Sequence, residues 1–159
     1  IRLMMVVPTE LEASEIAPRI WQGSAPPPSD AVRKAGFDIL VLAAYEYQPP
    51  ANMFGGIVVL HVPLDDSRLT GREWVQVVST ARMVAKRVSA GDKALITCQA
   101  GRNRSGIITA VTLHLLTGKA GTSIVRRIKA LRKDALTNDS FVARLVQLRA
   151  TTLSASGVR

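Results

Sequence analysis

The sequence predicts a single α/β domain whose central, mostly parallel and twisted sheet of about four to five strands is flanked by helices. Three observations lead to this fold class. The chain has 159 residues, a length that suits one domain with its own hydrophobic core. It is 47% hydrophobic and 21% charged, a composition that excludes a disordered chain. Apolar runs of strand length alternate with segments of helical periodicity. We therefore expect one domain over 1–159, with irregular ends at 1–15 and 153–159.

Four apolar runs predict the strands of the sheet: 19–23, 37–44, 57–62 and 94–97. The first, RIWQG, follows a segment over 1–18 that we expect to be irregular. The second, FDILVLAA, and the third, IVVLHV, are typical of buried strands, and Pro63 is expected to end the third. The fourth, ALIT, continues directly into Cys98. Proline-containing loops at 26–28 and 45–56 separate the early elements.

The segments between and after these strands predict helices. They are a short helix that ends at Ala35, a long one between Thr70 and Gly91, one over 104–117, one over roughly 122–133, and a last one capped by Asn138. Thr70 and Glu73 have the spacing of a capping box, which fixes the start of the long helix. Gly118 is expected to stop the helix that begins near Arg104.

Charge is unevenly distributed along the chain. The net charge is +9, but residues 1–79 carry −3 and residues 80–159 carry +12. A basic C-terminal half attracts anions such as phosphate groups, nucleic acid or acidic lipid headgroups. Aromatic residues make up only 4%, which argues against binding of single strands by base stacking. The single cysteine excludes an internal disulfide and favours a reducing, cytoplasmic location, and no apolar run reaches the ~20 residues of a transmembrane segment.

The most informative stretch is CQAGRNRSG, from Cys98 to Gly106, between an apolar strand and an apolar helix. It therefore forms a loop at the carboxyl end of a strand, where open α/β sheets bind ligands. Gly101 permits a tight turn in which successive backbone N–H groups face inward and hold an oxyanion, while the following helix adds its positive end. The predicted phosphate-binding residues are Gln99, Ala100, Gly101, Arg102, Asn103 and Arg104.

Cys98 and Arg104 complete this predicted site. The inward amides, the helix N-terminus and a nearby arginine all favour the cysteine thiolate over the thiol. The planar guanidinium of Arg104 can bind two oxygens of a phosphoryl group at once. We therefore expect in-line attack by sulfur on phosphorus, giving a cysteinyl-phosphate without a metal or other cofactor.

The same run resembles the C-x5-R-[ST] signature of cysteine-dependent protein phosphatases, most closely the dual-specificity type. The resemblance extends from about Ile16 to Leu148: IAPRIWQGS resembles the family's first strand, VPLDDS its general-acid loop and NDSFVARL its closing helix. It implies the fold of these phosphatases and a phosphorylated protein as substrate. The expected reaction is hydrolysis of phosphotyrosine, with phosphoserine and phosphothreonine as further substrates.

The resemblance also implies roles for residues around the loop. A general acid on a separate loop protonates the leaving oxygen, and Asp66, which lies 32 residues before Cys98, is assigned to it. Asp65 is a close competitor, because adjacent side chains point in different directions. Ser105 matches the family's hydroxyl after the arginine, which hydrogen-bonds the sulfur and eases its departure. Thr97 departs from the usual histidine before the cysteine, and this leaves the reactivity of the thiol open.

Several alternatives stay open at this stage. Arg102 is either a solvent-facing rim residue or a contact for substrates with extra negative charge. The same chemistry on phosphoinositides or RNA 5′ polyphosphate is one alternative, and a catalytically weak phosphate-binding pseudophosphatase, supported by Thr97, is another. A rhodanese-type sulfurtransferase is disfavoured by Asp66 and Ser105. A general nucleic-acid binder is the remaining class, without specific recognition of DNA.

Overall fold

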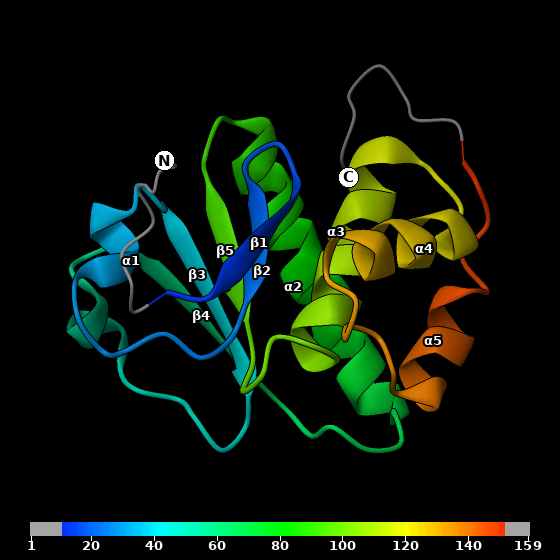
Figure 1. The fold of residues 1–159 in the computed structure, drawn as a ribbon, viewed down its shortest axis with the longest axis horizontal. Helices are drawn as coiled ribbons and strands as arrows, with labels where there is room; N and C mark the ends of the chain where they lie inside the picture. The colour runs from blue at the N-terminus through cyan, green and yellow to red at the C-terminus, as the bar shows by residue number, and fades with distance from the viewer. Residues whose placement is uncertain (1–10, 152–159) are drawn as a thin grey trace.

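The computed structural model describes residues 11–151, and its sheet has the strand that precedes Cys98 at its centre (Figure 1). The five strands lie in the order β1 (Ala13–Ala17), β2 (Ile20–Gly23), β5 (Ala94–Thr97), β3 (Ile39–Ala44) and β4 (Val58–Leu64). Only β1 runs antiparallel to its neighbour, and the other pairs are parallel. The predicted α/β class with a mostly parallel sheet is therefore confirmed. Of the ends expected to be irregular, residues 1–10 and 153–159 lie outside the described residues.

Helices cover both faces of the sheet (Figure 1). The short helix α1 (Ala31–Lys34) and the 3-10 helix η2 (Ala51–Phe54) pack on one face, over the smaller apolar cluster. The larger cluster fills the other face, beneath α2 (Gly71–Ser89), α3 (Arg104–Thr117), α4 (Gly121–Leu131) and α5 (Asp139–Leu145). The predicted capping box of α2 is present, Gly118 ends α3 in the left-handed conformation, and Asn138 caps α5.

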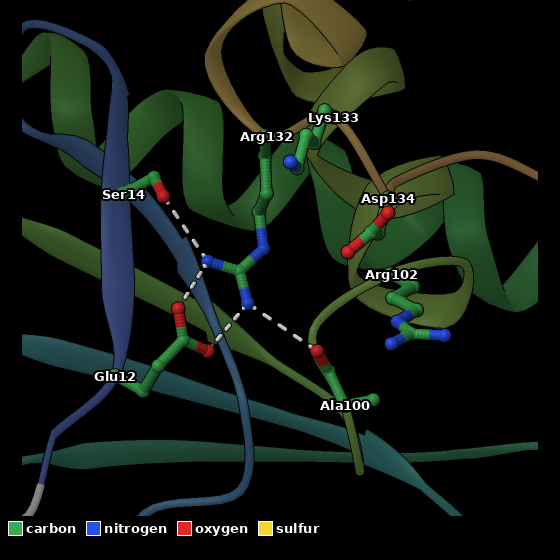
Figure 2. A pocket seen from close by; sticks show the side chains of 7 residues that line it. All are labelled: Glu12, Ser14, Ala100, Arg102, Arg132, Lys133 and Asp134. Atoms are coloured by element: carbon green, nitrogen blue, oxygen red, sulfur yellow. Dashed lines mark hydrogen bonds and ion pairs between the residues drawn. The ribbon is translucent and has the colours of Figure 1, made fainter.

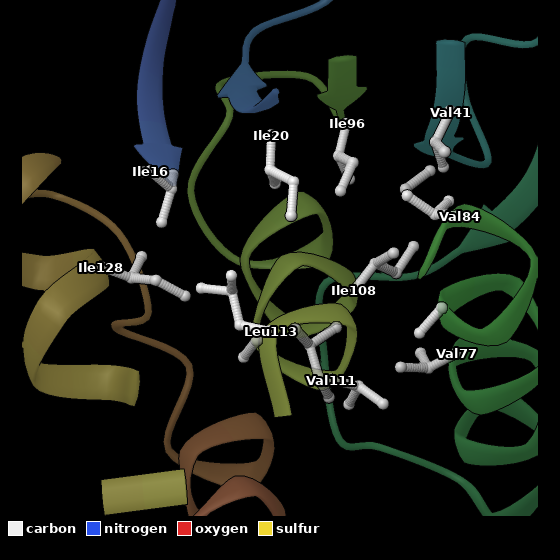
Figure 3. Packing of buried hydrophobic residues seen from close by; sticks show 14 of the residues in the cluster. Ile16, Ile20, Val41, Val77, Val84, Ile96, Ile108, Val111, Leu113 and Ile128 are labelled. Carbon is white, nitrogen blue, oxygen red and sulfur yellow. The ribbon is translucent and has the colours of Figure 1, made fainter. Parts of the chain in front are cut away.

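Helix α3 is the central element of the larger layer. Ten of its 14 residues are buried, because α2, α4, α5 and the sheet all contact it. Figure 3 shows Ile108 and Val111 of α3 in one cluster with Ile96 of β5 and Val77 of α2. This packing fixes the N-terminal end of α3 against the carboxyl end of β5, where the loop that begins at Cys98 connects them.

Two predicted elements need correction. The start was expected to be irregular through residue 18, but Ala13–Ala17 form β1, which pairs with β2 across a turn at Pro18 and Arg19. Its sequence, ASEIA, contains one large apolar side chain and therefore gives little strand signal, and its pairing with β2 is not visible in the local pattern. Strand β4 was expected to be buried and to end at Pro63, yet it is partly exposed and continues to Leu64. It is an edge strand with a register shift opposite Pro63, and both features accommodate a residue without an N–H.

Candidate active site

The candidate site lies where three parallel strands end at the same edge of the sheet. Glu46 follows β3, Asp66 follows β4, and Cys98 follows the central strand β5. Because β5 pairs with both β2 and β3, the loop after it is supported on two sides. Asp66 and Cys98 are 32 residues apart in sequence, and the parallel topology brings their loops to one edge.

The backbone carbonyls of the loop point away from its concave side. The Gln99 carbonyl accepts a hydrogen bond from the Ala25 N–H at 3.2 Å, and the Arg102 carbonyl accepts one from the Leu136 N–H at 3.1 Å. Side chains of Gln22 and Arg132 bind the carbonyls between them. Within 11–151, the N–H groups of residues 99–104 donate no backbone hydrogen bond. Carbonyls held outside and N–H groups left free are the arrangement of an oxyanion-binding nest.

Gly101 makes this tight path possible. Its φ of +69° lies in the left-handed region, which side chains disfavour. A Cβ at this position would also lie 2.5 Å from the carbonyl carbon of Gly23, so the loop touches the end of β2 backbone to backbone. Only a glycine satisfies both the dihedral angle and the contact.

Cys98 lies at the base of the loop with 3% of its surface exposed. Its Sγ is 3.3 Å from the Oγ of Ser105, in the first turn of α3. That hydroxyl and the positive N-terminal end of α3 both stabilise a negative sulfur. The structure thus brings together Cys98 and Ser105 as the sequence predicted, and Cys98 is also a member of the larger apolar cluster.

The guanidinium of Arg104 is held by a carboxylate that sequence reasoning missed. Its Nη1 and Nη2 donate to the two oxygens of Glu46 at 2.5 and 2.9 Å, and Nη1 also donates to the Leu64 carbonyl at 3.2 Å. The Nε is buried and has no partner within the described part of the chain. This end-on pair fixes the guanidinium and leaves the Nε edge available for an oxyanion.

The ionisable groups around Arg104 affect the pKa values of its guanidinium and of the Glu46 carboxyl. Burial lowers the pKa of the Arg104 guanidinium, but the hydrogen bonds to Glu46 and the attraction of nearby acidic groups together outweigh it, so the pKa lies above its usual value. Electrostatic attraction to Cys98 and Asp66 contributes in the same direction, which places both groups within electrostatic range of the guanidinium. On Glu46, the hydrogen bond from Arg104 outweighs burial and lowers the pKa of the carboxyl.

Asp66 and Asp65 occupy different environments. The Asp66 carboxylate accepts hydrogen bonds from the side-chain amides of Asn103 at 3.1 Å and Asn138 at 2.9 Å. Asn103 belongs to the loop, so it ties the Asp66 carboxylate directly to the candidate site. The Asp65 carboxylate instead accepts from the Ser67 hydroxyl at 2.8 Å, on the exposed side of its own loop.

The remaining predicted residues have distinct positions. Arg102 is exposed and lines a cavity of about 270 Å³ beside the loop, together with Glu12, Arg132 and Lys133 (Figure 2). Its backbone belongs to the loop, whereas its side chain lies on the rim. Thr97, in the place of the usual histidine, is fully buried, and its hydroxyl donates to the Val41 carbonyl of β3 at 2.7 Å.

Sequence reasoning missed Glu46 and Arg132, and it recognised Asn138 only as a helix cap. Glu46 lies in a loop with no motif, and Arg132 is one of several basic residues near the end of α4. Their partners lie 58 residues away for Glu46 and between 31 and 120 residues away for Arg132. No local pattern reports such distant pairings.

No protein-family model and no curated protein matches the chain. Its structure is similar to human DUSP28, with a TM-score of 0.75 and 24% identity over 90% of this chain and 95% of that one. It is also similar to a mouse protein described as a dual specificity phosphatase and complexed with zinc tungstate (TM-score 0.76, 22% identity, 91% and 89% covered). A third is a human tyrosine phosphatase-like serine/threonine/tyrosine-interacting protein (TM-score 0.70, 17% identity, 86% and 94% covered). At these identities the likeness shows the fold, which is the predicted one.

Proposed function

We propose that this chain is a cysteine-dependent, metal-independent phosphatase that acts on phosphotyrosine in proteins, and also on phosphoserine and phosphothreonine. The single observation that carries the proposal is the coincidence of four features at one sheet edge. Within residues 11–151 they are a buried sulfur, outward carbonyls with N–H groups that make no backbone hydrogen bond, a guanidinium with an unpartnered Nε, and a carboxylate tied to the loop. The likeness to solved phosphatase structures supports the same conclusion.

In the first step, the Cys98 thiolate attacks phosphorus in line with the leaving oxygen. The S–P bond forms as the P–O bond to the substrate breaks, and the carboxylic acid of Asp66 gives its proton to that oxygen. The loop N–H groups and the Nε edge of Arg104 stabilise the charge on the three equatorial oxygens. These donors are already oriented, so little reorganisation accompanies the reaction.

In the second step, water replaces sulfur on phosphorus. The Asp66 carboxylate removes a proton from the attacking water, and the S–P bond breaks to release inorganic phosphate. The sulfur leaves as a thiolate, and the Ser105 hydroxyl 3.3 Å away stabilises it by a hydrogen bond. Cys98, Arg104, Asp66 and Ser105 are thus the proposed catalytic residues, with the backbone of residues 99–104 as the phosphate-binding part.

The test is hydrolysis of an aryl phosphate and of matched tyrosine-, serine- and threonine-phosphorylated peptides, with a chelator present. We expect turnover by the wild type, highest on phosphotyrosine, and none by Cys98→Ser. A phosphoinositide and a triphosphorylated RNA in the same panel examine the alternative substrates. Activity that requires a divalent ion, or that survives the loss of the sulfur, would contradict the mechanism.

Thr97 supports a second candidate function, a phosphate-binding protein with little turnover. Its hydroxyl donates to the Val41 carbonyl on the neighbouring strand β3 and not to the loop that begins at Cys98. This candidate predicts binding of phosphopeptides at micromolar concentration without release of phosphate. Phosphate release by the wild type in the same panel excludes it.

Two further observations bear on location. Among residues 11–151, no helix is both long and apolar enough to cross a bilayer. The proposed mechanism needs the only cysteine of the chain in its reduced form, and a reducing compartment such as the cytoplasm supplies that condition.

A further inference from the structure

Arg132, which follows the last residue of α4, connects the candidate site to strand β1 (Figure 2). Its Nε donates to the Gly101 carbonyl at 2.7 Å, and its Nη2 donates to the Ala100 carbonyl at 3.3 Å. The other donors bind Glu12 at 2.6 and 2.8 Å and the Ser14 hydroxyl at 3.1 Å. These contacts use all five N–H donors of a guanidinium.

We propose that Arg132, held by Glu12, is a positioning residue that keeps the phosphate-binding loop in its anion-receptive conformation. This inference rests on the proposed function, because it assigns the part of the chain that organises that same site. Arg132 acts on the outer side of the loop through carbonyl oxygens, and it is therefore distinct from Arg104, which faces the phosphate.

Peptide geometry explains how the contact acts on the far side of the loop. In a planar trans peptide, the C=O of one residue and the N–H of the next point in opposite directions. Outward hydrogen bonds to the carbonyls of Ala100 and Gly101 therefore turn the N–H groups of Gly101 and Arg102 inward. Two of the donors that stabilise the phosphoryl group thus depend on a side chain that never touches it.

Glu12 fixes the guanidinium from the other side. Hydrogen bonds from Arg132 outweigh burial and lower the pKa of the Glu12 carboxyl, so Glu12 stays ionised at neutral pH. The Arg132 side chain is 10% exposed and that of Glu12 is 63% exposed, which places the pair at the wall of the 270 Å³ cavity. The cavity gives water access to the loop carbonyls when the side chain is shortened, so we expect the loop to lose its orientation while the fold persists.

The chain offers a matched control in Arg127, on the same helix. Its Nε donates to the Ile16 carbonyl of β1 at 2.8 Å, so Arg127 also joins α4 to β1 but does not contact the loop. Arg132→Met, Glu12→Gln and Arg127→Met are compared with the wild type. The readouts are kcat/KM on an aryl phosphate, the pH dependence of Cys98 alkylation by iodoacetamide, and protection of Cys98 by inorganic phosphate.

We expect kcat/KM of Arg132→Met to fall on the order of 100-fold, the scale of a misplaced catalytic geometry. In Arg132→Met, the pH dependence of Cys98 alkylation should move to higher pH than in the wild type. Inorganic phosphate should also protect Cys98 less, because fewer N–H groups face the sulfur. Glu12→Gln should change kcat/KM, the alkylation profile and phosphate protection in the same direction but less. Arg127→Met should lower thermal stability and leave these three readouts unchanged. If Arg132→Met retains the wild-type alkylation profile and phosphate protection, the inference is wrong. Alkylation and protection need no turnover, so they separate this outcome from failure of the proposed function.

Discussion

Asp65 and Asp66 are adjacent in sequence, yet only Asp66 is bonded to the loop that carries the cysteine. The amide of Asn103 holds one oxygen of Asp66 and the amide of Asn138 holds the other, so both the loop and the start of α5 orient this carboxylate. Asp65 is bonded to Ser67. The choice between the two, open from the sequence, therefore favours Asp66 on the basis of its neighbours.

The pair offers a prediction with its own control. Asp66→Asn keeps the shape but cannot donate a proton, so kcat should fall by about 100-fold or more, within the usual range for general acid–base catalysis. Asp65→Asn should leave kcat within a factor of about two of the wild type. Steady-state kinetics on an alkyl phosphate, whose leaving oxygen needs the proton, measures both. Equal losses in the two variants would contradict the assignment.

Glu46 leads to a prediction about pH. The pKa of its carboxyl is lowered by the hydrogen bond from Arg104. A group whose pKa is lower in the folded state stabilises the protein fully above its unfolded pKa, and this stabilisation is lost as pH falls through the folded pKa. We therefore expect Glu46→Gln to lower Tm at neutral pH, and the difference from the wild type to shrink on acidification below the usual glutamate pKa.

Thermal melts at a series of pH values measure this difference. Glu15→Gln is the control, because Glu15 is exposed on β1 and has no ion pair within the described ranges. Its variant should track the wild type at every pH. Glu46→Gln should also raise KM, since Arg104 loses one charged partner that fixes its direction. A Tm difference that grows as the pH falls would contradict the role of the ion pair.

At the scale of elements, the loop between β5 and α3 depends on Gly101, which adopts a left-handed backbone conformation and packs against the backbone of β2. Gly101 has a left-handed φ of +69° and lies against Gly23. Gly56 has a φ of +89°, and a Cβ added there would meet no atom of the described residues within 4 Å. Replacing either by alanine therefore costs the left-handed strain of about 1–2 kcal/mol. Only Gly101→Ala adds a clash with the backbone of β2.

This comparison gives a prediction for the loop. Gly56→Ala should lower the free energy of unfolding by about 1–2 kcal/mol and leave kcat/KM unchanged. Gly101→Ala should lower it further and also abolish protection of Cys98 by phosphate, because the loop must move away from β2. Chemical denaturation and alkylation kinetics measure the two effects. Similar behaviour of the two variants would show that the contact with Gly23 is unimportant.

The elements also show where sequence patterns succeed and fail. Local signals determined α2, α3 and α5: a capping box at Thr70, a glycine stop at Gly118 and a cap at Asn138. Strand β1 was not predicted, because Ile16 is its one large apolar residue and its pairing with β2 is not visible in the local sequence pattern. Strand β4 was misjudged because an edge position, which is a property of the whole sheet, permits Pro63. In the site, the contiguous motif from Cys98 was predictable, whereas Glu46 and Arg132 act through partners far along the chain.

At the scale of the whole molecule, the larger core layer supports the site through α3. Val77 on α2 is fully buried in that layer, while Val75 on the same helix is 65% exposed. The two valines therefore form a matched pair for testing how much the layer contributes, because helix propensity changes equally when either becomes alanine.

Val77→Ala should destabilise the protein by about 2 kcal/mol, since two methyl-sized groups leave a cavity in a packed core. Val75→Ala should change the free energy of unfolding by less than about 0.5 kcal/mol. Both variants should keep kcat at a temperature where they are folded, because neither residue lies at the sheet edge. Denaturant melts with parallel assays measure this, and a loss of kcat in folded Val77→Ala would show that the layer also tunes the site.

The most direct test of the central claim is to identify the atom that carries phosphate during turnover. The phenolate of an aryl phosphate with an acidic phenol leaves without taking up a proton, so Asp66→Asn should complete the first step with such a substrate. The intermediate should then accumulate, because no base activates water for the second step. Mass spectrometry after a rapid quench should find the phosphoryl group on Cys98 and on no other residue. Phosphate on a different side chain, or hydrolysis without any covalent adduct, would contradict the account.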